Sequence, residues 1–258
     1  MNKLFLLCIV CMLSFVTIER ADAQQINVLT YNVNACRNEA GNVDVAKTAK
    51  VIADANVDLA AIQEVDVNTK RTRNVDQAKE LAKLTQMPYH HFAKGIDLQG
   101  GEYGILILSK FPIKDSFRIE LPRKSGEQRV LSGVQVELPN KKNIVFMNTN
   151  IAGSQADKLA HVEGIINASK STDLPIILAG DFGTMPGAPE INALDQNFTR
   201  TCPTEDCPKV YPVKAPTRAI SHIMYTPNSF KTLSHNVIDE KLDYASDKRP
   251  VVAELELL

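Results

Sequence analysis

The sequence predicts an α/β protein in which helices cover two β-sheets. Continuous apolar runs predict buried strands at residues 105–108, 144–147 and 176–179. Alternating apolar and polar residues predict half-buried strands at residues 26–31 and 130–138. Between these strands, apolar residues recur at helical spacing over residues 43–55, 75–85 and 155–168. Two sheets covered by helices form the simplest arrangement that buries all of these apolar faces.

The start of the chain predicts a secretory signal peptide over residues 1–23. Lys3 is followed by an apolar run at 4–18 and by Ala21-Asp22-Ala23, a small-x-small cleavage signal. The run is shorter than the ~20 residues of a membrane-spanning helix, and no later segment reaches that length. Cys8 and Cys11 lack the preceding small residues of a lipoprotein cleavage site. We therefore expect cleavage near Ala23 and release as a secreted protein, periplasmic or extracellular.

The remaining residues, 24–258, are expected to form one domain, because no Pro/Gly/Ser-rich linker or composition shift divides them. The formal net charge is -1, and the four charged residues of the signal peptide cancel one another. A balanced charge of this kind is not a nucleic-acid-binding footprint. We expect a monomer without a membrane span.

Three cysteines follow the signal peptide: Cys36, Cys202 and Cys207. In an exported chain, the spacing of Cys202 and Cys207 favours a local disulfide that closes a loop. Metal ligation is the weaker interpretation, because no second Cys or His pair has zinc-finger spacing. Cys36 is then expected to be a buried free thiol.

Polar residues stand where the predicted strands give way to loops. These residues are Asn32, Glu64, Asn150, Asp181 and Asp247. Because α/β folds gather ligands at such strand ends, we expect these side chains to share one site. Arg71 and Arg73, which follow Glu64, are expected to be solvated charges, with a phosphate contact as the alternative.

Seven short segments together resemble the endonuclease/exonuclease/phosphatase superfamily, in order and over nearly the whole mature chain. They are TYNV at 30–33, QE at 63–64, GEYGILILS at 101–109, MNTN at 147–150, GDFG at 180–183, ISHI at 220–223 and SDKRP at 246–250. The resemblance implies a four-layer α/β/β/α sandwich with its site between the edges of two packed sheets. It also places Glu64 at the metal-ligand position, with Asn32 supporting it and Tyr103 in the same site. Carboxylates with water and phosphate are the ligands that Mg²⁺ prefers.

The chain departs from this resemblance at the four positions that would carry the chemistry. Asn150 replaces a histidine, and an amide can neither carry charge nor transfer a proton. Gly183 replaces an asparagine that helps to place the attacking water. Ser221 replaces the aspartate that orients the catalytic histidine, and Lys248 replaces that histidine itself. We therefore expect none of the catalytic groups to be intact.

Lys248 is expected to act as a counter-ion and not as a new general base. A lysine has an unperturbed pKa of ~10.4 and is protonated at neutral pH. The carboxylates of Glu64, Asp181 and Asp247 would raise that pKa further, and the ammonium would oppose a nearby metal ion. We expect it to neutralise the carboxylates and to fill the position of the metal.

Two histidines near the motifs are not expected to substitute for the missing ones. His222 neighbours Ser221 in a predicted strand, so its side chain points to the opposite face and is expected to be a packed histidine. His161 lies on a predicted amphipathic helix and is expected at the surface or boundary. No other catalytic motif is present: the sequence lacks Gly-x-Ser-x-Gly, His-Glu-x-x-His and a phosphate-binding loop ending in Gly-Lys-Ser/Thr.

The sequence thus predicts an exported protein of this fold with a disabled catalytic centre. It is expected to need no cofactor and to bind Mg²⁺ or Mn²⁺ weakly through Glu64. The expected remaining function is binding of a phosphate-bearing ligand or of a protein partner, neither of which the sequence identifies. The alternative is a slow Mg²⁺-dependent phosphodiesterase or phosphatase that uses Glu64, Asp181 and Asp247. Four simultaneous losses oppose this alternative, because one general acid or base alone contributes ~10²- to 10⁴-fold.

Overall fold

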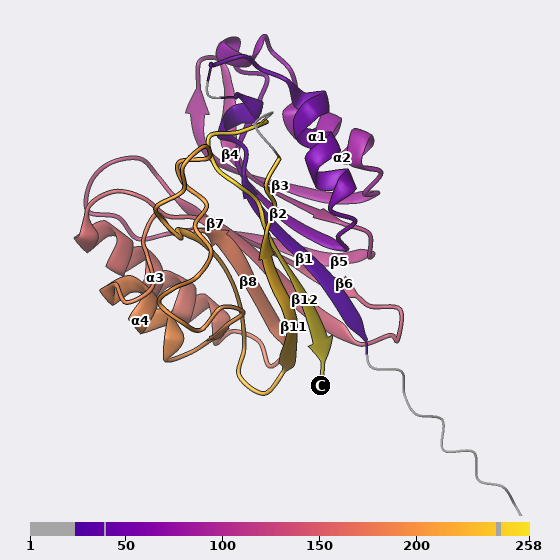
Figure 1. Cartoon of the computed structure of the whole chain (residues 1–258), viewed down its shortest axis with the longest axis vertical. Helices are drawn as coiled ribbons and strands as arrows, with labels where there is room; N and C mark the ends of the chain where they lie inside the picture. Colours follow the sequence, from indigo (N-terminus) through magenta and orange to yellow (C-terminus); the bar gives the residue numbers. More distant parts are fainter. Residues whose placement is uncertain (1–23, 39, 241–243) are drawn as a thin grey trace, which may run out of the picture.

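The chain folds into two mixed six-stranded β-sheets packed face to face, with helices on both outer surfaces (Figure 1). The structure is a computed structural model that describes residues 24–38, 40–240 and 244–258. The predicted signal peptide lies outside the described residues. Within those residues, no helix is long and apolar enough to cross a membrane.

The first sheet has the strand order β11-β12-β1-β2-β4-β3. Its strands are β1 (Gln25–Asn32), β2 (Leu59–Val67), β3 (Tyr89–Leu98), β4 (Gly101–Ser109), β11 (Phe230–Val237) and β12 (Val251–Leu257). The second sheet has the order β5-β6-β7-β8-β10-β9. Its strands are β5 (Ile113–Glu120), β6 (Val130–Glu137), β7 (Asn143–Asn150), β8 (Ile176–Asp181), β9 (Thr199–Arg200) and β10 (Ser221–Tyr225).

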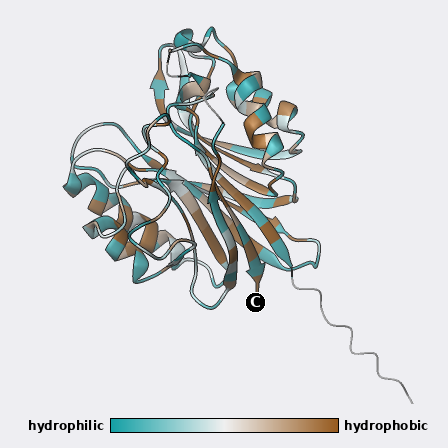
Figure 2. Cartoon of the chain, viewed as in Figure 1, coloured by the Kyte–Doolittle hydropathy of each residue, from teal (hydrophilic) through white to brown (hydrophobic). Residues whose placement is uncertain are grey.

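Four helices cover the outer faces of the two sheets. They are α1 (Val45–Asp54), α2 (Gln77–Thr85), α3 (Gln155–Ser169) and α4 (Pro189–Asp195). Side chains at their first turns cap three of them, since Asp44, Asp76 and Ser154 each accept a hydrogen bond from a backbone N–H three residues on. In Figure 2 the hydrophobic colour concentrates on the strands, whereas the helices alternate hydrophobic and hydrophilic segments.

Three apolar layers account for this packing. The central layer, between the sheets, includes Ile26, Phe146 and Ile177. Leu29 belongs to the layer beneath α1 and α2, and Leu178 to the layer beneath α3 and α4. This arrangement confirms the predicted four-layer sandwich. It also corrects the prediction of half-buried strands at 26–31 and 130–138, because both faces of β1 and β6 are largely covered.

The cysteine predictions are confirmed where the structure describes them. Cys202 and Cys207 form a disulfide, and Cys36 is a buried free thiol. Burial raises the pKa of Cys36 to about 12, so this thiol stays protonated at neutral pH.

Candidate active site

Two parallel strand pairs bring the predicted residues together. β1 pairs in parallel with β2, and β7 pairs in parallel with β8, with α1 and α3 as the respective crossover helices. Because parallel strands end at the same edge of their sheet, each pair presents its polar ends side by side. Asn32, Asn150 and Asp181 are the last residues of β1, β7 and β8, and Asn150 lies opposite Asp181 in the register.

Glu64 reaches the same site from within a strand, which corrects its predicted place at a strand end. The register of β2 against β4 shifts between Gln63 and Val65. Glu64 at this irregularity has a φ of 60°, in the left-handed region. A β-bulge redirects a side chain in this way. Gln63 points between the sheets, where its Nε2 donates to Asn148 Oδ1 at 2.8 Å.

Asn32 joins the carboxylates of the two sheets. Its Nδ2 donates to Glu64 Oε1 at 2.7 Å and to Asp181 Oδ2 at 2.9 Å. The other Asp181 oxygen, Oδ1, accepts from the Gly183 amide at 2.9 Å. Burial raises the pKa of Asp181, and the charge of Lys248 offsets only part of that effect. The buried carboxyl of Asp181 is therefore engaged on both of its oxygens.

Lys248 places its ammonium among these carboxylates. Its Nζ lies 3.0 Å from Asp247 Oδ1 and 3.9 Å from Glu64 Oε1, and its side chain is 12% exposed. Burial lowers the pKa of Lys248, but the charges of Glu64, Asp181 and Asp247 outweigh burial, so the pKa lies above its usual value. The side chain is thus a protonated counter-ion at neutral pH.

Gly183 and Ser221 occupy the other two substituted positions. Gly183 has a φ of +58°, and a Cβ built on it would lie 3.1 Å from Ile151 O. Its carbonyl accepts from Lys158 Nζ at 2.8 Å and from Arg218 Nη2 at 3.2 Å. Ser221 pairs with Asp181 in the register of β10 against β8. Its hydroxyl is buried and has no hydrogen-bond partner within the described part of the chain.

Tyr103 is held by a buried ion pair. The Arg71 guanidinium lies 5.3 Å from the Tyr103 ring centroid and makes two 2.7 Å hydrogen bonds to the buried carboxylate of Asp66. Burial raises the pKa of Tyr103. The prediction of a solvated charge at Arg71 is therefore wrong, because its guanidinium is paired with Asp66, whereas the phosphate-contact alternative stays a prediction. The two arginines of that segment differ, because Arg73 remains exposed.

The prediction for His222 is confirmed, and that for His161 is wrong. His222 is buried as predicted, with Nε2 3.2 Å from Thr184 O. His161, which was expected at the surface or boundary, is only 1% exposed. Neither of its ring nitrogens has a hydrogen-bond partner among the described residues. It lies on the side of α3 that packs on the sheet, where Val162 and Ile165 are also buried.

An open cleft of about 370 Å³ lies over these strand ends. Six of the predicted residues line it, namely Glu64, Asn150, Asp181, Gly183, Asp247 and Lys248. Asn32 and Ser221 are buried outside its lining, and Tyr103 lines a small adjoining cavity together with Asn150. Among its other lining residues, four have polar side chains that the sequence did not single out, namely Arg129, Lys158, Tyr211 and Arg218.

The sequence could have indicated only some of these four cleft residues. Lys158 lies in the first turns of α3, shortly after the end of β7, and Arg218 shortly precedes β10. A cation close to a polar strand end is a detectable pattern. Tyr211 carries no such signal, and Arg129 directly precedes β6, whose apolar first residues do not mark a polar strand end.

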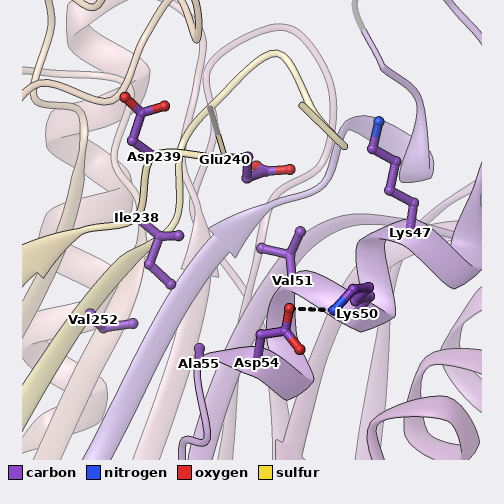
Figure 3. Close-up of a pocket in the computed structure, with 9 residues that line it drawn as sticks. All are labelled: Lys47, Lys50, Val51, Asp54, Ala55, Ile238, Asp239, Glu240 and Val252. Carbon is purple, nitrogen blue, oxygen red and sulfur yellow. Dashed lines mark hydrogen bonds and ion pairs between the residues drawn. The ribbon is translucent and has the colours of Figure 1, made fainter. Parts of the chain in front are cut away.

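A wider groove of about 580 Å³ lies away from the strand ends, between α1 and the segment that follows β11 (Figure 3). It has an apolar floor that includes Val51 and Val252 and a charged rim. The rim charges are paired within the protein: Lys50 bonds Asp54 at 2.7 Å, and Glu240 accepts from Ala245 N at 2.8 Å. The chemistry-bearing residues lie at the smaller cleft, which we therefore treat as the candidate site.

Comparisons with known proteins agree with this geometry. The model of the endonuclease/exonuclease/phosphatase family matches residues 29–247. No functionally curated protein matches the chain. Solved structures similar to it include an endonuclease/exonuclease/phosphatase from Beutenbergia cavernae, with 21% identity, a TM-score of 0.73, and coverage of 90% of this chain and 72% of that one.

Two Bacteroides thetaiotaomicron structures are also similar. One is an endonuclease/exonuclease/phosphatase family protein with 16% identity, a TM-score of 0.74, and coverage of 92% of this chain and 99% of that one. The other is a mannosyl-6-phosphatase with 16% identity, a TM-score of 0.70, and coverage of 89% and 99% respectively. At these identities the likeness shows the fold. Together with the family match, it shows that the chain belongs to the endonuclease/exonuclease/phosphatase family, a superfamily of metal-dependent phosphoesterases.

Proposed function

We propose that this protein is a family member that does not hydrolyse phosphoesters and whose cleft serves binding. The observation that carries the proposal is the Lys248 ammonium, 3.0 Å from Asp247 and 3.9 Å from Glu64. A divalent ion held by carboxylates needs their oxygens to face it, and like charge opposes its entry. The residues present therefore fit an internal ammonium better than Mg²⁺ or Mn²⁺, whose binding we propose to be weak and dispensable.

The remaining groups also support an inert centre. Gly183 has no side chain to place a water, the neutral Ser221 hydroxyl orients a histidine poorly, and the Asn150 amide cannot exchange a proton. In the rival hydrolase, Asp181 would be the base and Glu64 and Asp247 would surround the metal. However, Asp181 already accepts from Asn32 and from the Gly183 amide. These two bonds compete with an attacking water for the Asp181 oxygens and so oppose the rival.

We further propose that the protein is exported. The predicted signal peptide motivates this proposal, and the Cys202–Cys207 disulfide supports it, because disulfides persist in oxidising compartments. A measurement of the N-terminal residue of the protein recovered from its host would test it. A mature chain beginning near Gln24 is expected, and a chain retaining Lys3 would contradict the proposal.

Hydrolysis assays test the inert centre. The purified protein is incubated with Mg²⁺ or Mn²⁺ and with chromogenic phosphomonoesters, chromogenic phosphodiesters or supercoiled plasmid. We expect no turnover above that of a Glu64→Gln variant, which serves as the control for contaminating enzymes. A turnover of ~1 s⁻¹ in the parent, absent from the control, would contradict the proposal, since this is an ordinary enzyme rate.

A further inference from the structure

Three cations besides Lys248 line the cleft: Arg129, Lys158 and Arg218. Lys158 and Arg218 come from α3 and from the segment before β10, yet both donate to the carbonyl of Gly183, at 2.8 and 3.2 Å. Gly183 is one of the four substituted positions. One backbone oxygen therefore holds two positive groups close together in the cleft.

Two of these cations, Lys158 and Arg218, are not neutralised by carboxylates as Lys248 is. Within residues 24–38, 40–240 and 244–258, no carboxylate forms an ion pair with Lys158 or Arg218. An ammonium has three donors and a guanidinium five, so one bond to Gly183 leaves most of them available. Arg129 pairs with Glu127 at 2.8 Å and keeps further donors.

Tyr211 positions two of the cations. The Arg218 guanidinium lies 5.9 Å from its ring centroid, and Lys248 Nζ lies 5.4 Å from it. A cation near an aromatic face is held by the ring quadrupole. Like charges gathered in this way repel each other, and an anion between them relieves the repulsion.

We propose that Lys158, Arg218 and Arg129 form a metal-independent site for a tetrahedral dianion, the phosphate or sulfate group of a small molecule. The inference rests on the proposed inert centre, because the protein's own cations, in place of a metal ion, neutralise the charge of the ligand. Guanidinium and ammonium donors suit the oxygens of such a group. The cleft volume of about 370 Å³ lies at the lower end of the range for small-molecule sites.

Calorimetric titration in EDTA tests this site with inorganic phosphate, sulfate and acetate as probes. Phosphate and sulfate should bind the parent more tightly than acetate does. Lys158→Gln and Arg218→Gln should each weaken phosphate binding by about tenfold, because each removes a charged hydrogen-bond donor. Lys170→Gln, an exposed lysine at the far end of α3, is the matched control and should change nothing. Circular dichroism and thermal melts establish that each variant is folded.

Each outcome bears on the inference separately from the hydrolysis assay. Binding that requires Mn²⁺ would overturn the metal-independent site. Equal binding of acetate, or equal loss in Lys170→Gln, would overturn a specific tetrahedral site in favour of general cationic attraction. Absence of binding with and without Mn²⁺ would overturn the inference and leave the inert centre standing. Turnover in the hydrolysis assay would instead contradict the proposed function.

Discussion

Replacement of Lys248 by methionine should destabilise the protein and make its stability respond to divalent metal. The Lys248 side chain is 12% exposed, and its ammonium neutralises a cluster that contains the buried carboxyl of Asp181. Removal of one partner from a buried ion pair costs about 3–5 kcal/mol. We expect about 3 kcal/mol, at the lower end, because Asp247 is partly exposed. For a chain of this size that loss lowers Tm by roughly 6–12 °C.

The effect of Mn²⁺ on Tm distinguishes the Lys248→Met variant from the parent more clearly than the loss of stability does. Mn²⁺ should enter the position that the ammonium leaves, and a ligand at one hundred times its Kd stabilises by about 2.7 kcal/mol. Mn²⁺ should therefore restore most of the Tm of Lys248→Met and have little effect on the parent. Lys50→Met is the matched control, because its partner Asp54 is exposed and such a helix pair contributes only about 0.3–0.5 kcal/mol. Equal metal stabilisation of parent and Lys248→Met would refute the placement of the ammonium.

Three further outcomes are expected. Burial lowers the pKa of His222 to about 4, so between pH 6.5 and 4 this imidazole gains a proton only in the unfolded state. The His222 imidazole should therefore cost about 3 kcal/mol of the free energy of unfolding as pH falls through that window. Urea unfolding at several pH values measures this loss, which should be smaller in His222→Gln. Gln63→Met leaves Asn148 Oδ1 unpaired and should lower the free energy of unfolding by about 1–3 kcal/mol. The double variant Gln63→Met/Asn148→Leu removes both partners and should partly recover this stability in thermal melts. Ser221→Asp alone should lower Tm, because a second carboxyl then lies opposite the buried Asp181, and an unchanged Tm would contradict that reasoning.

The sequence predicts the layers of this fold because periodicity reports burial directly. The three apolar runs at 105–108, 144–147 and 176–179 lie in β4, β7 and β8. The three predicted helices are α1, α2 and α3, with ends displaced by at most two residues. Burial of β1 was misjudged, because a polar residue such as Thr30 is paired with Gln63 between the sheets instead of facing solvent.

The site was predictable where motifs mark it and not where folding alone assembles it. Asn32, Asp181 and Lys248 were found from short motifs. The left-handed backbone of Glu64 was not predictable, because a β-bulge depends on the partner strand β4. Arg218 was missed for a related reason, since its hydrogen bond to Gly183 spans distant segments of the chain.

Restoration of the substituted groups depends on whether the backbone still accepts them. Asparagine tolerates the left-handed φ of Gly183 better than most residues do. Its Cβ would lie 3.1 Å from Ile151 O, which must move by a few tenths of an ångström, and 3.6 Å from Lys158 Nζ, an ordinary contact. Because Ser221 lies opposite Asp181 on the adjacent strand, an aspartate there would face the same site.

The most direct measurement is phosphoester hydrolysis by the combined Asn150→His, Gly183→Asn, Ser221→Asp and Lys248→His variant. We predict Mn²⁺-dependent turnover that the parent lacks and that an added Glu64→Gln substitution removes. Lys248→His alone should gain little, because its orienting partner is still serine and such groups act as one unit. A combined variant that is folded and binds Mn²⁺, yet stays inert on nucleic acid, phospholipid and sugar phosphate substrates, would contradict the claim that only the functional groups are missing.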